Sequence, residues 1–426
     1  MTVDLNVSIA SSEFKADPFP FYRHLREQAP VFRVKMPDGQ TAWLVTRYDD
    51  VVNVLTDERF GKDAFRVLSK EKLAAAPWMT KLLTPFLMPL ARHMLNRDPP
   101  DHTRLRALVQ QAFSPRLVEG MRGRIETLAH ELLDRAIPRG RMDLIADYAL
   151  PIPTTVIAEM LGVPVGDRHK FHRWSRTMLS AGASRFGLLR ALPSAWLFMR
   201  YIRKLIKNRR ASLSNDLISG LITAKDAGDP LSDDELLSMI LLLIVAGHET
   251  TVNLIASGML ALLENPDQLE RLRSNPGLIK PAVEELLRFT APVETATERF
   301  ACEEVELAGV KIAKGDLVLA AIASANRDDG QFINPDTLDI AREPNRHLAF
   351  GLGIHFCLGA SLARLEGQLA INTLLARTRD LQLAVAPGKL RWRSGFVLRG
   401  LQSLPVSFTA AAPAAARSEP ADAIRA

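Results

Sequence analysis

The sequence predicts a mainly α-helical fold with small β-sheets, and three of its patterns support that class. A helical pattern runs unbroken from Asp233 to Glu264, which corresponds to roughly 48 Å at about 1.5 Å per residue. Leucines recur at spacings of four, three and four between Leu358 and Leu369, so a second long helix buries one face. Strand-like runs are short and gather mainly in residues 31–45 and 305–322.

Length and composition indicate one large soluble domain. The 426 residues hold 47% apolar side chains and contain neither a repeat nor a Gly/Ser linker. We therefore expect a single domain over residues 1–409 and a disordered Ala- and Pro-rich tail over 410–426. The two cysteines predict no disulfide framework, and the N-terminus lacks the layout of a signal peptide or anchor, which together favour the cytoplasm. The net charge of +6 is scattered, so nucleic acid is not an expected partner.

The N-terminal elements come in a simple order. A short helix is expected over 17–27, a β-hairpin with a Pro-Asp-Gly turn over 31–45, and a helix over 48–55. Residues 65–95 are apolar but broken by prolines, which discourages one regular helix. Two interpretations stay open for this stretch: packed loops and short helices in the core, or an apolar lid over a cavity.

A histidine and an arginine share one face of the next helix. Asp98 or Asp101 can cap this helix, and His102 and Arg106 lie four residues apart within it. On their own, two such residues more often belong to a solvated face than to a site.

The middle of the chain is helical and carries a basic stretch. Amphipathic helices are expected over 118–137 and 153–161. Residues 186–199 are strongly apolar, but an arginine and Pro193 interrupt them and they are too short to span a bilayer. Residues 200–210 are basic, and two interpretations remain: a solvated helix face beside a buried one, or the basic collar of a flap that transiently touches a membrane surface.

The long helix carries a polar segment inside the core. Ser232 and Glu235 form a capping box at its start. Residues 236–246 are apolar on nearly every face, so the helix runs through the core; a membrane span is disfavoured because the apolar run is short. The hexamer Ala-Gly-His-Glu-Thr-Thr at 246–251 needs a reason, since unpaired polar groups in a core cost free energy.

Further elements follow the long helix. Glu285 and Arg288 are three residues apart among apolar neighbours, as in a buried ion pair. Short strands joined by tight turns are expected between 305 and 322, and residues 395–397 form the tip of a late hairpin.

The run from Phe350 to Ala360 precedes the last long helix. Cys357 lies at or just before that helix N-terminus, where free N–H groups and the helix dipole favour a thiolate, which is a soft ligand for iron. The glycines let the backbone bend tightly and approach a flat partner. A lone cysteine before a helix is more often a small buried hydrophobe. No Cys-x-x-Cys-His occurs, which excludes covalent c-type haem attachment.

This run matches the pattern Phe-Gly-x-Gly-x-His-x-Cys-x-Gly without a gap and resembles the haem-binding loop of the cytochrome P450 superfamily. Residues 96–106, 246–251 and 285–288 resemble three further motifs of that family, in the family's order. The resemblance implies the cytochrome P450 fold, with a helix-rich half, a smaller N-terminal β-rich part, and a long central I helix over a buried haem b. It implies Cys357 as the iron ligand.

The resemblance also assigns roles to other residues. The catalytic pair would be Glu249, which relays protons, and Thr250, which holds O2 and its waters. The implied cofactor-binding residues are His102, Arg106, Ala246, Gly247, Arg299, Phe350, His355, Cys357 and Gly359, of which His102, Arg106, Arg299 and His355 would hold the haem propionates. The structural ion pairs are Glu285, Arg288 and Arg342, with Arg346 as the alternative third member. The expected pocket residues are Leu82, Leu83, Phe86, Leu242, Val245, Val293 and Val397.

The implied activity is that of a soluble bacterial-type haem-thiolate monooxygenase, which inserts one oxygen atom from O2 into a C–H bond. The nearly all-aliphatic or aromatic pocket positions predict a lipophilic substrate such as a fatty acid, terpenoid, steroid or polyketide. Electrons would come from a separate ferredoxin and its NAD(P)H-dependent reductase, with Arg104, Arg116 and Arg364 as docking cations, and the chain is expected to be a monomer. A haem-thiolate peroxygenase, a rearrangement enzyme of the same fold and a non-catalytic haem sensor remain alternatives; peroxygenases of this family lack the acid–alcohol pair.

Overall fold

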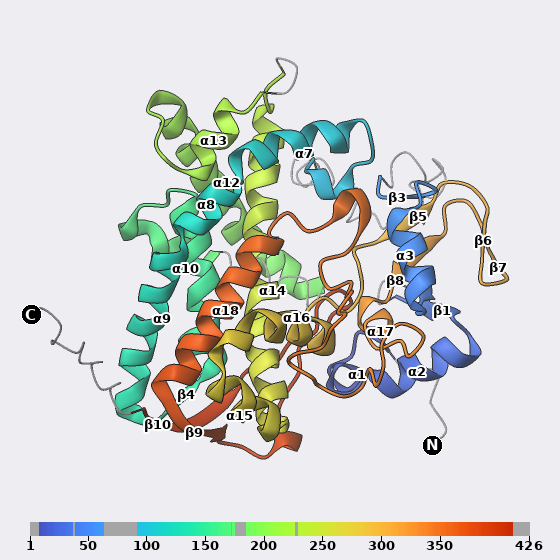
Figure 1. Cartoon of the computed structure of the whole chain (residues 1–426). Coiled ribbons are helices and arrows are strands. Elements are labelled where there is room, and N and C mark those ends of the chain that lie inside the picture. The colour runs from blue at the N-terminus through green and yellow to red at the C-terminus, as the bar shows by residue number, and fades with distance from the viewer. Residues whose placement is uncertain are drawn as a thin grey trace, which may run out of the picture.

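Helices make up the larger part of the molecule, and most of the strands gather at one side of it (Figure 1). The computed structural model describes residues 8–36, 39–63, 92–171, 173–174, 185–225 and 229–411. Its helices are α1 (Ser12–Ala16), α2 (Phe19–Gln28), α3 (Tyr48–Thr56), α7 (Asp101–Ala112), α8 (Pro115–Gly120), α9 (Arg122–Ala136), α10 (Pro151–Met160), α12 (Arg185–Ala211), α13 (Leu217–Thr223), α14 (Asp233–Glu264), α15 (Pro266–Ser274), α16 (Ile279–Thr290), α17 (Ile322–Ala325) and α18 (Ala360–Arg377). Its strands are β1 (Val31–Lys35), β2 (Thr41–Val45), β3 (Phe60–Gly61), β4 (Arg141–Asp143), β5 (Arg299–Ala301), β6 (Val305–Leu307), β7 (Val310–Ile312), β8 (Leu317–Ala320), β9 (Thr378–Leu383) and β10 (Pro405–Ala410). The predicted fold class is confirmed.

The sheets are small and join distant parts of the chain. The largest has the strand order β1-β2-β8-β5-β3, and the others are β4-β10-β9 and β6-β7. β1 and β2 are the predicted hairpin, with Val31 opposite Val45, and β2 runs parallel to β8. The β-rich part is therefore not purely N-terminal: β5 and β8, which follow residue 298, complete its sheet.

Helix α14 runs through the middle of the helical part (Figure 1). The predicted capping box is present, because Ser232 Oγ accepts from Glu235 N and the Glu235 carboxylate accepts from Ser232 N. The helix packs against α10, α16 and α18. Among the described residues it is the one helix long and apolar enough to cross a membrane, but 61% of its most apolar window is buried inside the protein, as in a core helix.

One helix prediction needs correction. The helix expected over 118–137 is two helices, because α8 ends at Gly120, a poor helix former, and α9 begins at Arg122. Pro193 interrupts the apolar sequence of 186–199 but not the helix, since α12 continues through it. Phe198, Ile202 and Leu205 on α12 are buried, and this packing outweighs the one backbone hydrogen bond that proline removes.

The C-terminal limit of the predicted domain can be compared with the structure. Strand β10 reaches Ala410 and Ala411 N donates to Arg377 O (3.0 Å), so ordered pairing extends two residues past the expected limit at 409. The rest of the predicted tail, and residues 64–91 with the expected pocket residues Leu82, Leu83 and Phe86, lie outside the described residues.

A buried charge cluster ties the N-terminal helices to the end of the chain. Lys15 Nζ lies 2.8 Å from Glu294 Oε2, and Tyr22 OH donates to Glu294 Oε1 (2.6 Å). Arg399 Nε donates to Lys15 O (2.9 Å), and its guanidinium also bonds Thr290 O (3.2 Å). The cluster fixes the late hairpin, which we define as residues 391–402, against α1 and the segment after α16.

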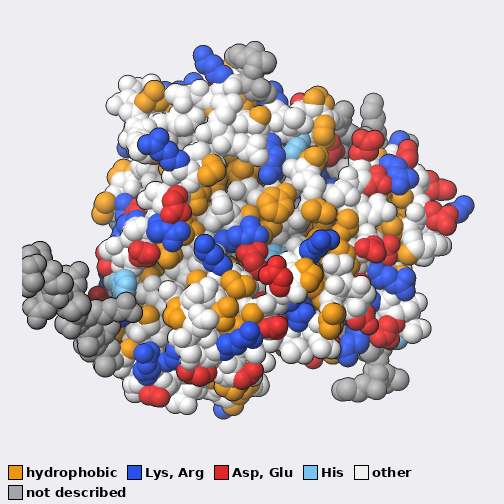
Figure 2. Space-filling view, viewed as in Figure 1, with side chains coloured by type: hydrophobic (Ala, Val, Ile, Leu, Met, Phe, Trp, Pro, Cys, Tyr) orange, Lys and Arg blue, Asp and Glu red, His pale blue; other side chains and the backbone are white. Residues whose placement is uncertain are grey.

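Lys, Arg, Asp and Glu side chains are interspersed over the face shown in Figure 2. This agrees with the modest net charge of +6.

Candidate active site

The cysteine loop is a tight, glycine-dependent turn in front of α18. Gly351 and Gly353 have φ of +69° and +73°, values that L side chains rarely adopt. A Cβ on Gly353 would also lie 2.8 Å from Leu55 O on α3. Cys357 N donates to Phe350 O (2.9 Å) and closes the loop.

An ion pair between α16 and α18 supports this loop. Arg364 donates to both carboxylate oxygens of Glu284 (2.7 Å each), and His347 Nε2 lies 3.1 Å from the same group. The Arg364 guanidinium lies 4.4 Å from the centre of the Phe350 ring. Burial would raise the pKa of Glu284, but the bonds from His347 and Arg364 outweigh it and hold that pKa at about 2. Arg364 is thus engaged within the chain, and it is not a free docking cation as expected.

The surroundings of Cys357 combine accessibility with dense packing. Its side chain is accessible to solvent, although protein atoms surround it closely. Burial raises the pKa of the thiol, whereas a backbone hydrogen bond from Gly359 and the charges of Arg106 and Arg364 lower it. Burial has the largest effect, so the pKa of the free thiol is raised overall, and the bonding and the cations only oppose that rise.

The middle of α14 is also accessible to solvent. Leu241 and His248 are buried, but Val245 between them is 39% exposed and Ala246 is exposed, although the helix runs through the core. Thr250 Oγ1 donates to Ala246 O (3.1 Å). Gly247, one helical turn before Thr251, adds no side chain to this part of the helix. Of the predicted pocket residues that are described, Leu242, Val293 and Val397 are partly buried.

Four predicted residues and one unpredicted residue form a cationic cluster. The rings of His102 and His355 are 4.3 Å apart. Burial lowers the pKa of His355 to about 2, helped by the nearby charges of Lys62, His102, Arg299 and Arg106. Burial also lowers the pKa of Lys62 to about 7, with Arg299 adding to the effect, and lowers the pKa of Arg299 to about 10.

This cluster is built for anions. Both ring nitrogens of His102, Nε2 of His355 and Nε of Arg299 are buried and make no hydrogen bond to any described residue. Buried donors of this kind cost free energy unless a ligand accepts from them. The residues therefore suit a cofactor that carries carboxylates at its edge and takes a thiolate ligand.

The predicted capping role of Asp98 is wrong: Pro100 precedes α7 without a side-chain cap, and Asp98 instead accepts from Lys62 N and Asp63 N (2.9 Å each).

Sequence reasoning missed Lys62. No local pattern marks it, because β3, which precedes it, reaches the cluster only by pairing with β5.

The Glu285 network is fully formed. Arg288 donates Nε and Nη2 to the two Glu285 oxygens (2.8 Å each), and both side chains are 0% exposed. Arg342 is the third member, with Nε 3.1 Å from both oxygens. Arg346, the alternative, only offers its carbonyl to Tyr48 OH (2.7 Å). Asn345 Nδ2 also donates to Glu285 (3.1 Å), which the sequence did not indicate.

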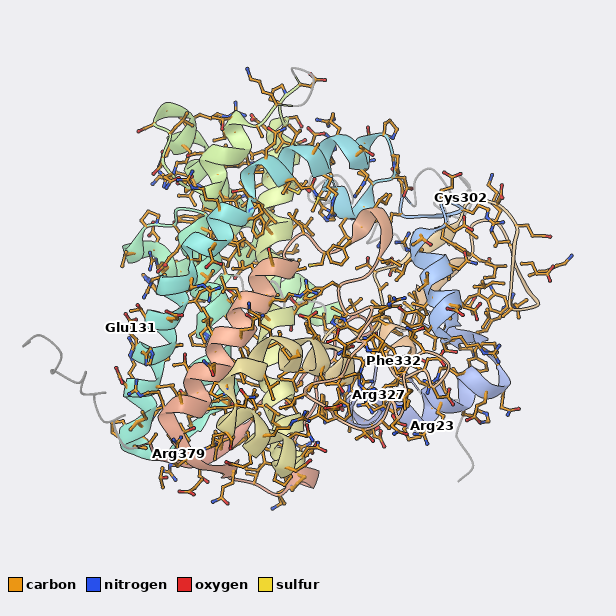
Figure 3. The ribbon with its side chains drawn as sticks, in the orientation of Figure 1. Arg23, Glu131, Cys302, Arg327, Phe332 and Arg379 are labelled. Atoms are coloured by element: carbon orange, nitrogen blue, oxygen red, sulfur yellow. The ribbon has the colours of Figure 1, made fainter. Side chains whose placement is uncertain are left out.

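Aromatic rings surround this network. Arg327 and Phe332, labelled in Figure 3, lie beside it: the Arg288 guanidinium is 5.2 Å from the Phe332 ring centre, and Arg327 lies 3.7 Å from that of Phe289.

The relay residues have partners that the sequence did not reveal. Glu249 Oε1 lies 2.7 Å from Arg393 Nη1 of the late hairpin. His248 Nδ1 bonds Ile244 O (2.7 Å), and burial lowers the pKa of this ring. On α18, Glu366 is buried with neither carboxylate oxygen hydrogen-bonded to a described residue, and this burial raises its pKa to about 8 against the opposing effect of nearby Thr251. A signal for Glu366 existed, because it lies on the leucine face of α18, four residues after Leu362.

Glu366→Gln should change how stability depends on pH. The folded state binds the Glu366 proton up to about pH 8, whereas the unfolded chain releases it near pH 4.5. Stability should therefore fall as pH rises through this window, by up to about 1.4 kcal/mol per pH unit. Glutamine removes that loss, so melting temperatures at pH 5 and pH 8 should show the variant gaining on the wild type at the higher pH. An equal difference at both pH values would contradict this assignment.

Comparisons with known proteins agree with this geometry. The sequence profile of the family described as Cytochrome P450 matches residues 7–276 and 277–385. The chain is 45% identical over 404 residues to the polyketide biosynthesis cytochrome P450 PksS of Bacillus subtilis, covering 93% of this chain and 97% of that protein. The solved structure of PksS covers 95% of this chain with a TM-score of 0.88, and this chain covers 100% of it.

Two further relatives bear on substrates. The vitamin D(3) 25-hydroxylase of Pseudonocardia autotrophica is 42% identical over 400 residues, which cover 93% of this chain and 95% of that protein. A myxobacterial cytochrome P450 in complex with myristic acid is 45% identical and has a TM-score of 0.87, with 94% of this chain and 98% of that chain covered.

Proposed function

The chain belongs to the cytochrome P450 family and is a haem-thiolate monooxygenase, and from this premise we propose that it hydroxylates a lipophilic substrate with electrons from a separate ferredoxin and its NAD(P)H-dependent reductase. The balanced reaction is RH + O2 + 2 e⁻ + 2 H⁺ → ROH + H2O. The observation that carries the proposal is that Cys357, beside the cationic cluster, and Val245 and Ala246, in the middle of the core helix α14, are all accessible to solvent.

The residues of this site divide the work between holding the cofactor and moving protons. Haem b, the family's cofactor, supplies when bound an iron that activates O2. Cys357 would be its ligand, with Phe350 and Gly359 shaping the loop, and Ala246 and Gly247 would leave room on the α14 side. His102, Arg106, Arg299, His355 and Lys62 would meet its carboxylates.

Proton handling falls to α14. Glu249 is 17% exposed, so its carboxylate can exchange protons with solvent. The Thr250 hydroxyl lies one residue further along the helix, where it would hold O2 and its waters. Together they would supply the two protons that the reaction consumes.

Thr250→Ala should uncouple the reaction. Without the hydroxyl, reducing equivalents should go to hydrogen peroxide, and product per NADPH should fall by about tenfold. This is less than the roughly 10²–10⁴-fold contribution of a direct proton donor, because Thr250 would hold O2 and its waters and would not give up the proton itself. The measurement is NADPH consumption, O2 consumption and product formation with purified redox partners. Ser257→Ala, a buried hydroxyl two turns further along α14, is the matched control and should couple like the wild type. Unchanged coupling in Thr250→Ala would overturn the relay assignment.

The substrate class rests on the pocket walls and on the relatives. The described wall positions Leu242, Val245, Val293 and Val397 are aliphatic. The relatives' names mention polyketide biosynthesis and vitamin D(3), and one solved structure holds myristic acid. We infer a fatty acid, steroid, terpenoid or polyketide as substrate, and a screen for spectral displacement of the iron-bound water would identify the class.

Partners and location remain part of the proposal. Arg364 is paired with Glu284 and Arg104 with Glu235, so Arg116 is the one expected docking cation without a carboxylate partner among the described residues. A monomer in the cytoplasm is expected. On α12, Trp196 and Leu197 are 48% and 42% exposed beside the exposed cations Arg200, Arg203 and Lys204, which supports transient contact with a membrane surface.

A further inference from the structure

The late hairpin has a tip that touches the predicted pocket wall. Its two arms pair through Trp392 and Leu401, and Arg393 N donates to Gly400 O (2.9 Å). At the tip, Val397 O accepts from Glu294 N (2.8 Å), next to Val293. Position 293 also forms an isolated bridge with Leu398.

The base of the same hairpin presses against α14. Gly400 has no room for a Cβ, because the Asn253 side chain occupies that space. One helical turn before Asn253, Arg393 reaches across to Glu249, with Nη1 2.7 Å from Oε1. The pair is partly enclosed, since the Glu249 and Arg393 side chains are 17% and 39% exposed.

The other charged or titratable groups around Glu249 do not offer the same bond. His248, the adjacent residue, uses Nδ1 on Ile244 O, and burial lowers its pKa. Thr250 directs its hydroxyl to Ala246 O. The position of the Glu249 carboxylate is therefore set by a residue of the hairpin, about 140 residues away in sequence.

We propose that Arg393 is a positioning residue that ties the proton-relay carboxylate of Glu249 to the hairpin walling the substrate pocket, so that the wall and the relay move as one unit. The inference rests on the proposed monooxygenase function and extends it. A substrate that packs against Val397 and Val293 then also fixes Glu249, which makes proton delivery depend on a filled pocket.

Arg393→Gln should lower product per NADPH by about fivefold, the rate equivalent of losing a partly exposed ion pair. The spectral Kd for substrate should change less than about twofold, because the wall itself is unchanged. Arg393→Lys, which keeps the charge, should recover most of the coupling. Arg391→Gln removes the same charge from an exposed position two residues away on the hairpin and should behave as the wild type.

A double-variant cycle separates positioning from a merely structural role. If Arg393 acts through Glu249, the double variant Arg393→Gln/Glu249→Gln should couple no worse than Glu249→Gln alone. Wild-type coupling in Arg393→Gln, or additive losses in the double variant, would overturn the proposal.

If the wild type forms no product from any lipophilic compound, the proposed function fails. Hydrogen–deuterium exchange of the holoprotein then tests separately whether the Arg393–Glu249 ion pair holds the late hairpin against α14. Residues 391–402 should exchange faster in Arg393→Gln and Glu249→Gln than in Arg391→Gln. Equal exchange in all three variants would refute the role of the Arg393–Glu249 ion pair.

Discussion

Cys357→Ala should abolish the thiolate-type Soret band of the ferrous carbon monoxide complex, together with monooxygenase turnover. The thiolate is the donor that favours O–O cleavage, and no other described soft ligand lies in the loop to replace it. The loop itself should survive, because its closure uses the backbone bond from residue 357 to Phe350 O, which alanine keeps.

Cys302→Ala is the matched control for this experiment. Figure 3 places Cys302 in the β-rich part, and its Sγ lies 3.8 Å from Phe300 O. Its replacement should leave both band and turnover unchanged. A wild-type complex with its band in the ordinary histidine-haem position would contradict the assignment of Cys357.

Arg288→Met should destabilise the fold by about 3–5 kcal/mol, since removing one partner of a buried pair leaves the other charge uncompensated. Glu285 is 0% exposed and would keep Arg342 as its one charged partner, with Asn345 Nδ2 and Asp339 N as neutral donors. The substitution also frees the carbonyls of Asn326 and Pro335, which each accept from Arg288 Nη1 at 2.8 Å. Soluble yield, haem content and melting temperature would all report the loss.

The control for Arg288 is an ion pair of the same type at the surface. Arg271 and Asp339 are 3.1 Å apart and 46% and 45% exposed, so Arg271→Gln should cost less than about 1 kcal/mol. Melting of Arg288→Met at the wild-type temperature would show that the network does not support the fold.

Local signals in the sequence were enough for elements with clear ends. The bounds of α14 could be predicted because Ser232 and Glu235 cap its start and Asn265-Pro266 ends it. Arg342, which the sequence favoured over Arg346, is the third member of the Glu285 network.

Long-range contacts explain what the sequence could not show. Lys62 and Arg393 reach the site only through strand pairing or the return of the late hairpin, and no spacing along the chain encodes these contacts. The continuity of α12 through Pro193 likewise depends on tertiary packing, which overrides a local helix breaker.

Isotopically labelled dioxygen tests the central claim most directly. The protein would be supplied with NADPH, a ferredoxin and its reductase, and a panel of fatty acids, steroids, terpenoids and polyketides, and the products analysed by mass spectrometry. The account predicts a hydroxylated product carrying one labelled oxygen atom, with the second label in water. A product that carries only unlabelled oxygen, or oxygen that comes from added hydrogen peroxide without NADPH, would contradict it.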